Sequence, residues 1–322
     1  MRDTFRKIAE DPTQVISLDN LRLLAASLAS EAEKSGRRFL LCDDLRQPAG
    51  DIAIHSVNTG YLSALLAFEL STTLAAEISA LRTHGGSQAC IARKVDPAAG
   101  QLGDTVTSAA LCGLMHDIGY LFIPTALRQR EIWEMSRDER EELKRHVIKG
   151  AAYLRTRMGD LVADAALLHH RLKNSLGYPR EDEAAALSST MESTVNVAMA
   201  VAVASAFDVM ICRRDYLHIE ALEELRCARG HQFDAVCLRA LSRVAPTFPV
   251  GSLVRLSSGH YGAVLAFNPD LPFRPSVLLL RDQEGVPLPE AKQVELKLQE
   301  YGKLRIRSFG GRWVDPVSYT HL

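Results

Sequence analysis

The sequence predicts a mainly α-helical protein with a small antiparallel β appendage at its C-terminal end. Apolar residues recur at helical spacing through most of the chain as far as residue 245. From Pro249 onward the pattern changes to short β-rich runs separated by glycine, asparagine and proline. With 322 residues, of which 47% are hydrophobic and 24% charged, the chain has an ordinary globular composition and room for one large and one small domain.

Four segments are expected along the chain. Residues 1–50 form a helical lead-in, which is too short for a sensing domain with its own core. Residues 51–245 form the large helical domain, residues 246–310 the β appendage and residues 311–322 a tail. The last residues, Val317–Leu322, fit neither pattern and resemble translated adapter sequence, so we expect that the natural C-terminus is missing.

Charge and cysteine usage exclude several classes of partner and compartment. The formal net charge of -1 gives no polyelectrolyte pattern, so no DNA or RNA polymer is expected as a partner. Six cysteines without a CxxC pair, and no signal-peptide pattern, favour a reduced cytoplasm. The longest apolar run, Val195–Ile211, is alanine-rich and interrupted by polar residues, which is typical of a buried core helix rather than a membrane span.

The first helices are predicted by apolar spacing. Leu18–Ser35 is amphipathic, and Ile52–Leu81 is a long helical pattern with His55 in its first turn. Asp51 lies four residues before His55, on the same side if the helix begins early enough. The alternative is an acidic residue that only starts the helix.

Leu111–Pro124, with the sequence LCGLMHDIGYLFIP, is the most informative stretch. An apolar helix runs into His116 and Asp117, breaks at Gly119 and stops at Pro124. A buried carboxylate is costly unless it is compensated, and a divalent metal bound by imidazole and carboxylate provides that compensation. The alternative is a hydrogen-bonded pair that caps the helix.

Further helices lead to three more histidines. A capping box at Ser136–Glu139 starts a helix that leads to His146, and a helix over Ala151–His170 ends in a histidine pair. A turn follows at Gly177–Pro179. The remaining elements predicted from spacing are helices over Val195–Ile211 and Ile219–Arg229 and strands over Leu253–Leu256, Tyr261–Phe267 and Ser276–Arg281.

Five histidines thus stand near the ends of predicted helices: His55, His116, His146, His169 and His170. Their segments, in chain order, are HSVNTGYLSALLA, LMHDIGYLFIP, RHVIKGAAYL and HHRLKNSLGYP, followed by AFDVMICRRDYL. Together they resemble the HD-GYP family, a branch of the HD phosphohydrolases. The resemblance covers about residues 50–240, and FPVGSLVRLSSGHYGAVLAFN resembles the segment that often follows the helical domain of that family.

The resemblance implies an HD-domain helical bundle in a bacterial signalling protein that hydrolyses cyclic di-GMP. The reaction would use a hydroxide that bridges two divalent metal ions, Fe or Mn. In the ligand set that the resemblance implies, Asp117 bridges the ions and is catalytic, Asp51 and Asp208 are further candidates, and the terminal ligands are His55, His116, His146, His169 and His170. The expected ligand is a cyclic dinucleotide or another phosphate ester, with a signalling protein or a second copy of the chain as further partners.

The same resemblance implies a substrate pocket. It assigns substrate binding to Gly177, Tyr178, Pro179 and Arg214, and it places Tyr120 at the catalytic position where the family has a phosphate-binding lysine. The alternatives are that Tyr178 only closes a turn and that Arg214 only pairs with Asp208 or a helix end. A histidine at a helix end can likewise act only as a cap.

Several motif positions depart from the family. Ser205 stands where the family has an aspartate ligand, and Asp208 retains only the second aspartate of that motif. Arg171, Asn174 and Ser175 replace a glutamate, an aspartate and a glycine. A serine hydroxyl is a poor metal ligand beside a carboxylate. The competing hypotheses are therefore a catalytically impaired scaffold that binds a nucleotide or a partner, and a hydrolase of another phosphate ester.

Overall fold

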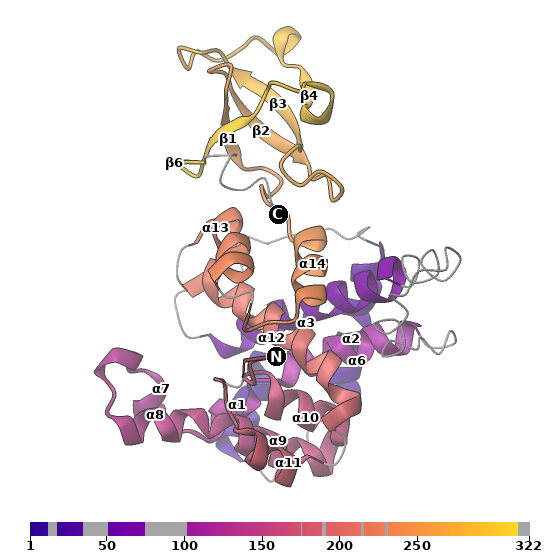
Figure 1. Ribbon diagram of the computed structural model, residues 1–322, viewed down its shortest axis with the longest axis vertical. Coiled ribbons are helices and arrows are strands. Elements are labelled where there is room, and N and C mark those ends of the chain that lie inside the picture. Colours follow the sequence, from indigo (N-terminus) through magenta and orange to yellow (C-terminus); the bar gives the residue numbers. More distant parts are fainter. Residues whose placement is uncertain are drawn as a thin grey trace.

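A helical body carries a small β-sheet at one end in the computed structural model of the chain (Figure 1). The structure describes residues 1–11, 18–34, 51–74, 102–174, 176–188, 191–213, 216–228 and 231–314. The mainly α prediction with an antiparallel appendage is confirmed. No helix within the described ranges is both long and apolar enough to cross a bilayer.

The helices follow one another in the chain, with short 3-10 or π turns between some of them. Before the histidine pair these are α1 (Arg2–Glu10), α2 (Leu18–Lys34), α3 (Ile52–Glu69), η2 (Leu70–Leu74), α6 (Leu102–Met115), η3 (Ile118–Phe122), α7 (Thr125–Arg128), η4 (Ile132–Glu134), α8 (Arg137–Lys144), α9 (His146–Met158) and α10 (Asp160–Leu168). After it come α11 (Glu181–Leu187), α12 (Met191–Arg213), α13 (His218–Glu223), η5 (Glu224–Ala228) and α14 (Ala235–Val244).

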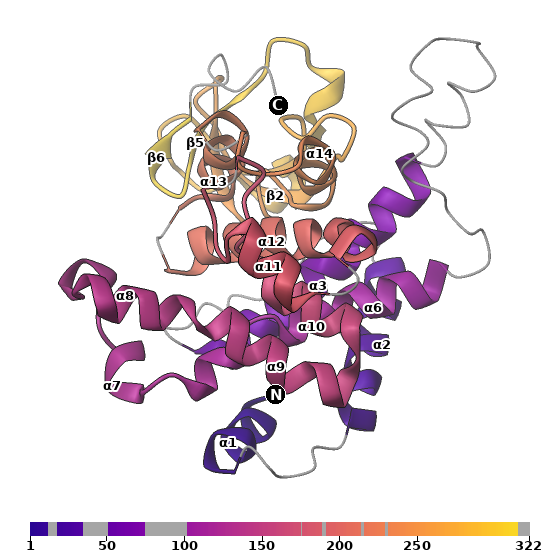
Figure 2. The same cartoon turned by 60° about the horizontal axis from the view of Figure 1, so that its bottom comes forward.

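Three helices, α3, α6 and α12, run through the middle of the helical body, and α2, α10 and α14 pack around them (Figure 2). Small residues allow α3 and α6 to approach closely. A Cβ added to Gly113 of α6 would lie 2.7 Å from the carbonyl oxygen of Thr59 and 2.8 Å from the Cα of Gly60, both on α3. This contact brings the N-terminal part of α3, with His55, against the C-terminal end of α6, with His116.

A second close approach joins the turn after α6 to α9. The Cβ of an alanine at Gly119 would lie 1.8 Å from the carbonyl oxygen of His146 and 2.7 Å from the backbone nitrogen of Gly150. The α-helix ends at Met115, earlier than the break predicted at Gly119, and the chain continues as η3, which contains that glycine. The break turns Asp117 toward His146. The close backbone contact between Gly119 and the first turn of α9 therefore helps to position the site.

The appendage is a six-stranded antiparallel sheet of strand order β4-β3-β2-β1-β5-β6. Its strands are β1 (Leu253–Leu256), β2 (Tyr261–Ala266), β3 (Ser276–Arg281), β4 (Glu295–Lys297), β5 (Ile306–Phe309) and β6 (Arg312–Trp313). The first three coincide with the predicted runs to within one residue. Ile219 of α13 packs into the apolar core of the sheet with Phe248 and Phe309, which attaches the appendage to the helical body.

The structure corrects some helix boundaries. The predicted helix over Ala151–His170 is two helices, α9 and α10, because Gly159 between them has a φ of 88°. Helix α1 was predicted only as part of the helical lead-in, and α7, α11 and α14 had no helix prediction of their own. In α1 only Phe5 and Ile8 are buried, too few to make a pattern. The end of the predicted helix over Ile52–Leu81 lies beyond the described residues.

We expect Gly119→Ala to destabilise the fold by about 3 kcal/mol or more, because the added methyl group meets backbone atoms that cannot rotate away. Urea unfolding measures the change as a shift of the transition midpoint. The matched control is Gly302→Ala, whose Cβ would meet nothing within 4 Å, and its free energy of unfolding should stay within about 0.5 kcal/mol of the parent. Equal midpoints for the two variants would contradict the close approach.

Candidate metal centre

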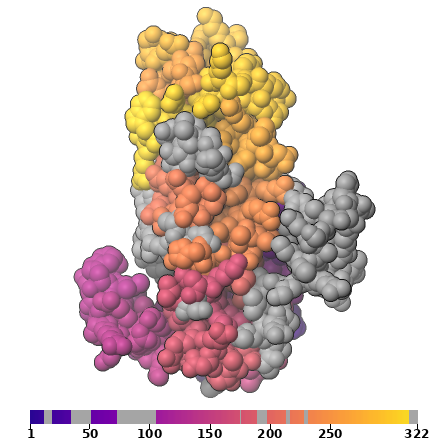
Figure 3. Space-filling view, viewed as in Figure 1, coloured from indigo at the N-terminus to yellow at the C-terminus, as the bar shows by residue number. Residues whose placement is uncertain are grey.

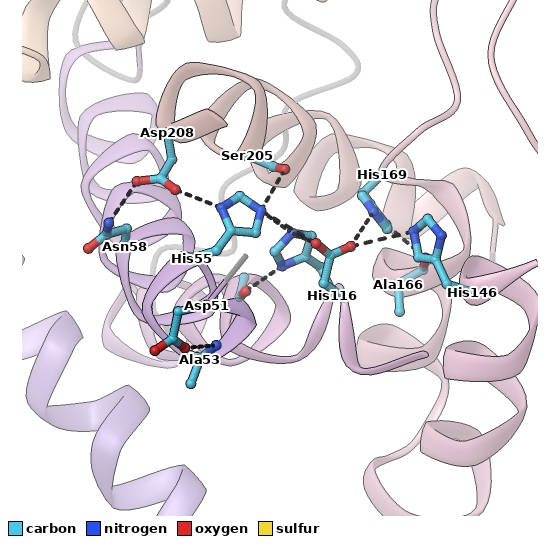
Figure 4. A network of polar contacts seen from close by, with 12 residues as sticks. Asp51, Ala53, His55, Asn58, His116, His146, Ala166, His169, Ser205 and Asp208 are labelled. Atoms are coloured by element: carbon cyan, nitrogen blue, oxygen red, sulfur yellow. Dashed lines mark hydrogen bonds and ion pairs between the residues drawn. The ribbon is translucent and has the colours of Figure 1, made fainter. Parts of the chain in front are cut away.

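Imidazoles from four separate segments gather around Asp117 inside the helical body, and Figure 4 labels those of His55, His116, His146 and His169. His55 comes from α3, His116 and Asp117 follow α6, His146 begins α9, and the histidine pair follows α10. The side chains of His55, His116, Asp117, His146 and His169 are each at most 8% exposed. The sequence-predicted histidines are therefore brought together as a buried cluster.

The two carboxylate oxygens of Asp117 face different histidines. Oδ1 lies 3.4 Å from Nε2 of His146 and 3.2 Å from Nε2 of His169. Oδ2 lies 3.4 Å from Nε2 of His55 and 3.4 Å from Nε2 of His116. We call Asp117, His146, His169 and His170 the three-histidine group, and His55, His116 and Asp117 the two-histidine group; within each, the ligand atoms lie within 4.8 Å of one another.

A backbone carbonyl on the side away from Asp117 fixes the orientation of three of the imidazole rings. In His116, His146 and His169, Nδ1 lies 2.7 to 2.8 Å from the backbone carbonyl oxygen three residues earlier. A carbonyl oxygen only accepts, so Nδ1 carries the proton and Nε2 presents a lone pair toward Asp117. Metal-ligating histidines have this arrangement: one ring nitrogen, here Nδ1, is hydrogen-bonded, and the other, here Nε2, is free to bind the metal.

His55 is held by a carboxylate instead of a carbonyl. Its Nδ1 donates to Oδ2 of Asp208 at 2.6 Å, and Oδ1 of Asp208 accepts from the amide of Asn58 at 2.7 Å. Asp208 therefore lies behind the imidazole, on the side away from Asp117. Asp208, a ligand candidate from the sequence, lies in neither group of possible ligands: in the structure it positions His55, and Asn58 positions Asp208. Asn58 was missed, although its place three residues after His55 puts both on one helix face.

The donor set fits a divalent cation. Asp117 Oδ1, His146 Nε2 and His169 Nε2 are buried without a hydrogen-bond partner in the part of the chain that the structure describes, and since all three are acceptors they cannot satisfy one another. Neighbouring ligand atoms about 2.0–2.1 Å from one tetrahedral ion are about 3.3 Å apart. The distances of 3.2 to 3.4 Å between the nitrogens and the Asp117 oxygens agree with that spacing.

Burial sets the protonation states that metal binding needs. Burial lowers the pKa of His116 to about 3 and also lowers the pKa of His169 and His170. For Asp117, burial by itself raises the pKa, but the facing imidazoles outweigh it and hold the pKa well below its usual value. At neutral pH these imidazoles are neutral and the carboxylate is ionised, so no proton has to leave before a cation binds.

Asp51 belongs to neither group. Its carboxylate accepts from the backbone nitrogens of Ala53 and Ile54 and pairs with the guanidinium of Arg2 at 2.8 Å. Because α3 begins at Ile52, Asp51 is in the extended N-cap conformation and its side chain folds onto the first turn. The structure has the alternative, an acidic residue at the helix start, and a role of Asp51 as a metal ligand stays a prediction.

Two tyrosines stack on ligand rings of the three-histidine group. The ring of Tyr120 lies 3.9 Å from that of His146 at 15°, and the ring of Tyr178 lies 4.6 Å from that of His170 at 26°. Burial raises the pKa of Tyr178 well above its usual value. The backbone nitrogen of Tyr178 donates to the carbonyl of His170, which holds the Gly-Tyr-Pro turn, Gly177 to Pro179, against the metal centre. Arg214 lies outside the described residues.

Ser205 faces the metal-binding side of His55. Its Oγ lies 3.3 Å from His55 Nε2, whereas Asp208, one turn later on α12, contacts Nδ1 of the same ring. Ser205 is therefore the residue of α12 that points at the two-histidine group, at the position where the resemblance expects an aspartate. Asn174, another departure, accepts a hydrogen bond from the backbone nitrogen of Leu176 and closes a local turn.

Comparisons with known proteins match two parts of the chain. The sequence model of the HD domain matches residues 52–210, and that of the KOW domain associated with HD domain matches residues 253–306. The cyclic di-GMP phosphodiesterase PA4108 of Pseudomonas aeruginosa is 30% identical over 192 residues, 58% of this chain. The match spans 44% of the length of that relative.

Among solved structures, Bd1817, described as an HDG"Y"P protein from Bdellovibrio bacteriovorus, is similar with a TM-score of 0.47 and 17% identity. The similarity covers 74% of this chain and 66% of that chain.

We expect Asp208→Asn to weaken metal binding at the two-histidine group by about 10-fold or more, since the ring of His55 loses its anionic support. Calorimetric titration with Mn²⁺ measures the affinity of each group. Binding at the three-histidine group should be unchanged, because Asp208 contacts none of its members among the described interactions. An unchanged isotherm would contradict the positioning role.

Asp51→Asn tests the helix-cap assignment of that residue. Asparagine caps a helix start as well as aspartate does, so the variant removes the negative charge and keeps the cap. We expect the same manganese content per chain as in the parent, measured by elemental analysis. A loss of bound metal would restore Asp51 as a ligand.

Proposed function

Through residues 52–210 the chain belongs to the HD domain family and is HD-GYP-like, and from that premise we propose that it is a metal-dependent phosphohydrolase that cleaves the phosphodiester of cyclic di-GMP. The observation that carries the proposal is the carboxylate of Asp117 between two groups of imidazoles. Such a donor set suits two divalent cations that share one carboxylate, and Fe or Mn fits its imidazole and oxygen ligands.

In this proposal some residues bind the cations and others orient the residues that bind them. The three-histidine group and the two-histidine group would hold the cations, with Asp117 common to both. Divalent cations bound there would polarise a phosphoryl oxygen and stabilise the charge that develops as the ester bond breaks. The carbonyl contacts of His116, His146 and His169, and Asp208 behind His55, keep the Nε2 atoms aimed at one point.

The surroundings of the three-histidine group suit a nucleotide. Tyr120 and Tyr178 present aromatic surface beside the ligands, and a purine base can stack on such a surface. Lys144 places its ammonium 5.8 Å from the centre of the Tyr178 ring. A positive charge there can meet a phosphate, a role that the resemblance gives to a lysine at the position of Tyr120. Lys144 was not singled out from the sequence because it sits in the run of charges before His146.

Ser205 favours a second candidate function, a scaffold that binds a cyclic dinucleotide without hydrolysing it. The two-histidine group has a neutral hydroxyl where a carboxylate would neutralise a second cation. Binding of metal and nucleotide without product would identify this function. A cytoplasmic location, a protein partner and a homodimer stay predictions.

The test is hydrolysis of cyclic di-GMP by protein purified anaerobically and supplied with Mn²⁺ or Fe²⁺ under reducing conditions. Product is measured by chromatography, and a panel of other phosphate esters tests the substrate class. We expect Asp117→Asn to lower the rate at least about 100-fold, because it removes the shared anionic ligand. His260→Gln, in the β appendage, is the matched control and should keep the parent rate. Equal rates for Asp117→Asn and the parent would overturn the proposal.

A further inference from the structure

We propose that the two groups bind metal with unequal affinity: one ion is held firmly by the three-histidine group, and a second binds the two-histidine group only when free metal is abundant. The inference rests on the proposed function, since it concerns the same centre. The residue that creates the difference is Ser205.

The ligand sets differ in number. The three-histidine group offers three imidazoles and Oδ1 of Asp117, enough for four-coordinate binding from the chain alone. The two-histidine group offers two imidazoles and Oδ2 of the same carboxylate. Its further neighbour on α12 is the hydroxyl of Ser205, which binds a divalent cation far less well than a carboxylate does.

The ligand sets also differ in charge. Asp117 is the one anionic residue in either group among the described residues, and its two oxygens are divided between them. Asp208 is anionic but is already engaged by Nδ1 of His55 and the amide of Asn58, on the far side of the ring. A second cation would therefore enter beside the first with little added negative charge, and the mutual repulsion of two cations opposes it.

Ser205 opposes the second ion in another way. His55 Nδ1 donates to Asp208, so Nε2 of the same ring is an acceptor, and the hydroxyl of Ser205 at 3.3 Å can donate to it. A cation at the two-histidine group has to displace this hydrogen bond. Among the described residues, the Nε2 atoms of His146 and His169 have no hydrogen-bond partner to lose. Metal binding at the two-histidine group thus costs His55 an interaction, whereas at the three-histidine group it costs His146 and His169 none.

The experiment counts ions. Full-length protein is loaded anaerobically with Mn²⁺, desalted into metal-free buffer, and analysed for manganese per chain; a calorimetric titration then measures the affinity of the sites. We expect about one retained ion per chain and a second site at least about 10-fold weaker. Ser205→Asp should retain about two ions, because the new carboxylate supplies the missing ligand and cannot donate to His55.

Three further variants keep the test decisive. Ser205→Ala is the matched control: it removes the hydroxyl without adding a ligand, so it should still retain one ion. His55→Gln should also retain one, and His169→Gln none, which locates the firmly held ion in the three-histidine group. Circular dichroism verifies that each variant is folded, and the His55 and His169 pair decides the location of the ion even if Ser205→Asp does not fold.

The outcomes separate the inference from the proposed function. Two ions of equal affinity in the parent, or retention that follows His55 rather than His169, would overturn the unequal-site inference and leave the phosphohydrolase standing. A folded parent that binds no manganese would overturn both. A retained ion without hydrolysis of any phosphate ester, even at high Mn²⁺, would remove the enzymatic proposal and leave the unequal sites standing.

Discussion

One buried carboxylate constrains this fold more than any other group. Asp117 is 6% exposed and ionised, and imidazoles rather than ammonium or guanidinium groups surround it among the described residues. The imidazoles favour the ionised carboxylate, but no resident cation faces it among the described residues, and a buried charge without such a partner is strongly unfavourable. A divalent cation bound there would remove the conflict, and its binding would then be coupled to the stability of the helical body at this residue.

The packing of the body serves this convergence. The contact at Gly113 joins α3 to α6, and the contact at Gly119 joins the turn after α6 to α9. At each contact the two backbone segments lie closer together than a residue larger than glycine would permit. Each of these glycines lies a few residues from a histidine of the cluster. The appendage has a separate apolar core that meets the body through Ile219 of α13. The chemistry thus belongs to the helical body, while the α7–α8 hairpin projects from one side of it (Figure 3).

Sequence patterns predicted the parts of the site that depend on residue type and local spacing. The five histidines and Asp117 were identified from motifs, and the capping box at Ser136 starts α8 as expected. Asp51 and Asp208 were assigned as ligand candidates because carboxylates lie at suitable spacings. Spacing along a helix shows which residues share a face, but it does not show whether a carboxylate meets Nδ1 or Nε2 of a given ring. Asp208 meets Nδ1 of His55, and Asp51 meets its own helix end.

The sequence by itself determined the fold class, the strands of the appendage and the set of imidazoles, because periodicity, turn residues and residue chemistry are local properties. Only the tertiary structure decided how that set is divided. The partition of Asp117 between two groups, the place of Asp208 behind His55 and the approach of Ser205 to the same ring join positions up to 153 residues apart. Those contacts exist because α3, α6 and α12 pack at close range. The spacing of apolar residues within one helix does not determine how that helix packs against another that is distant in the sequence.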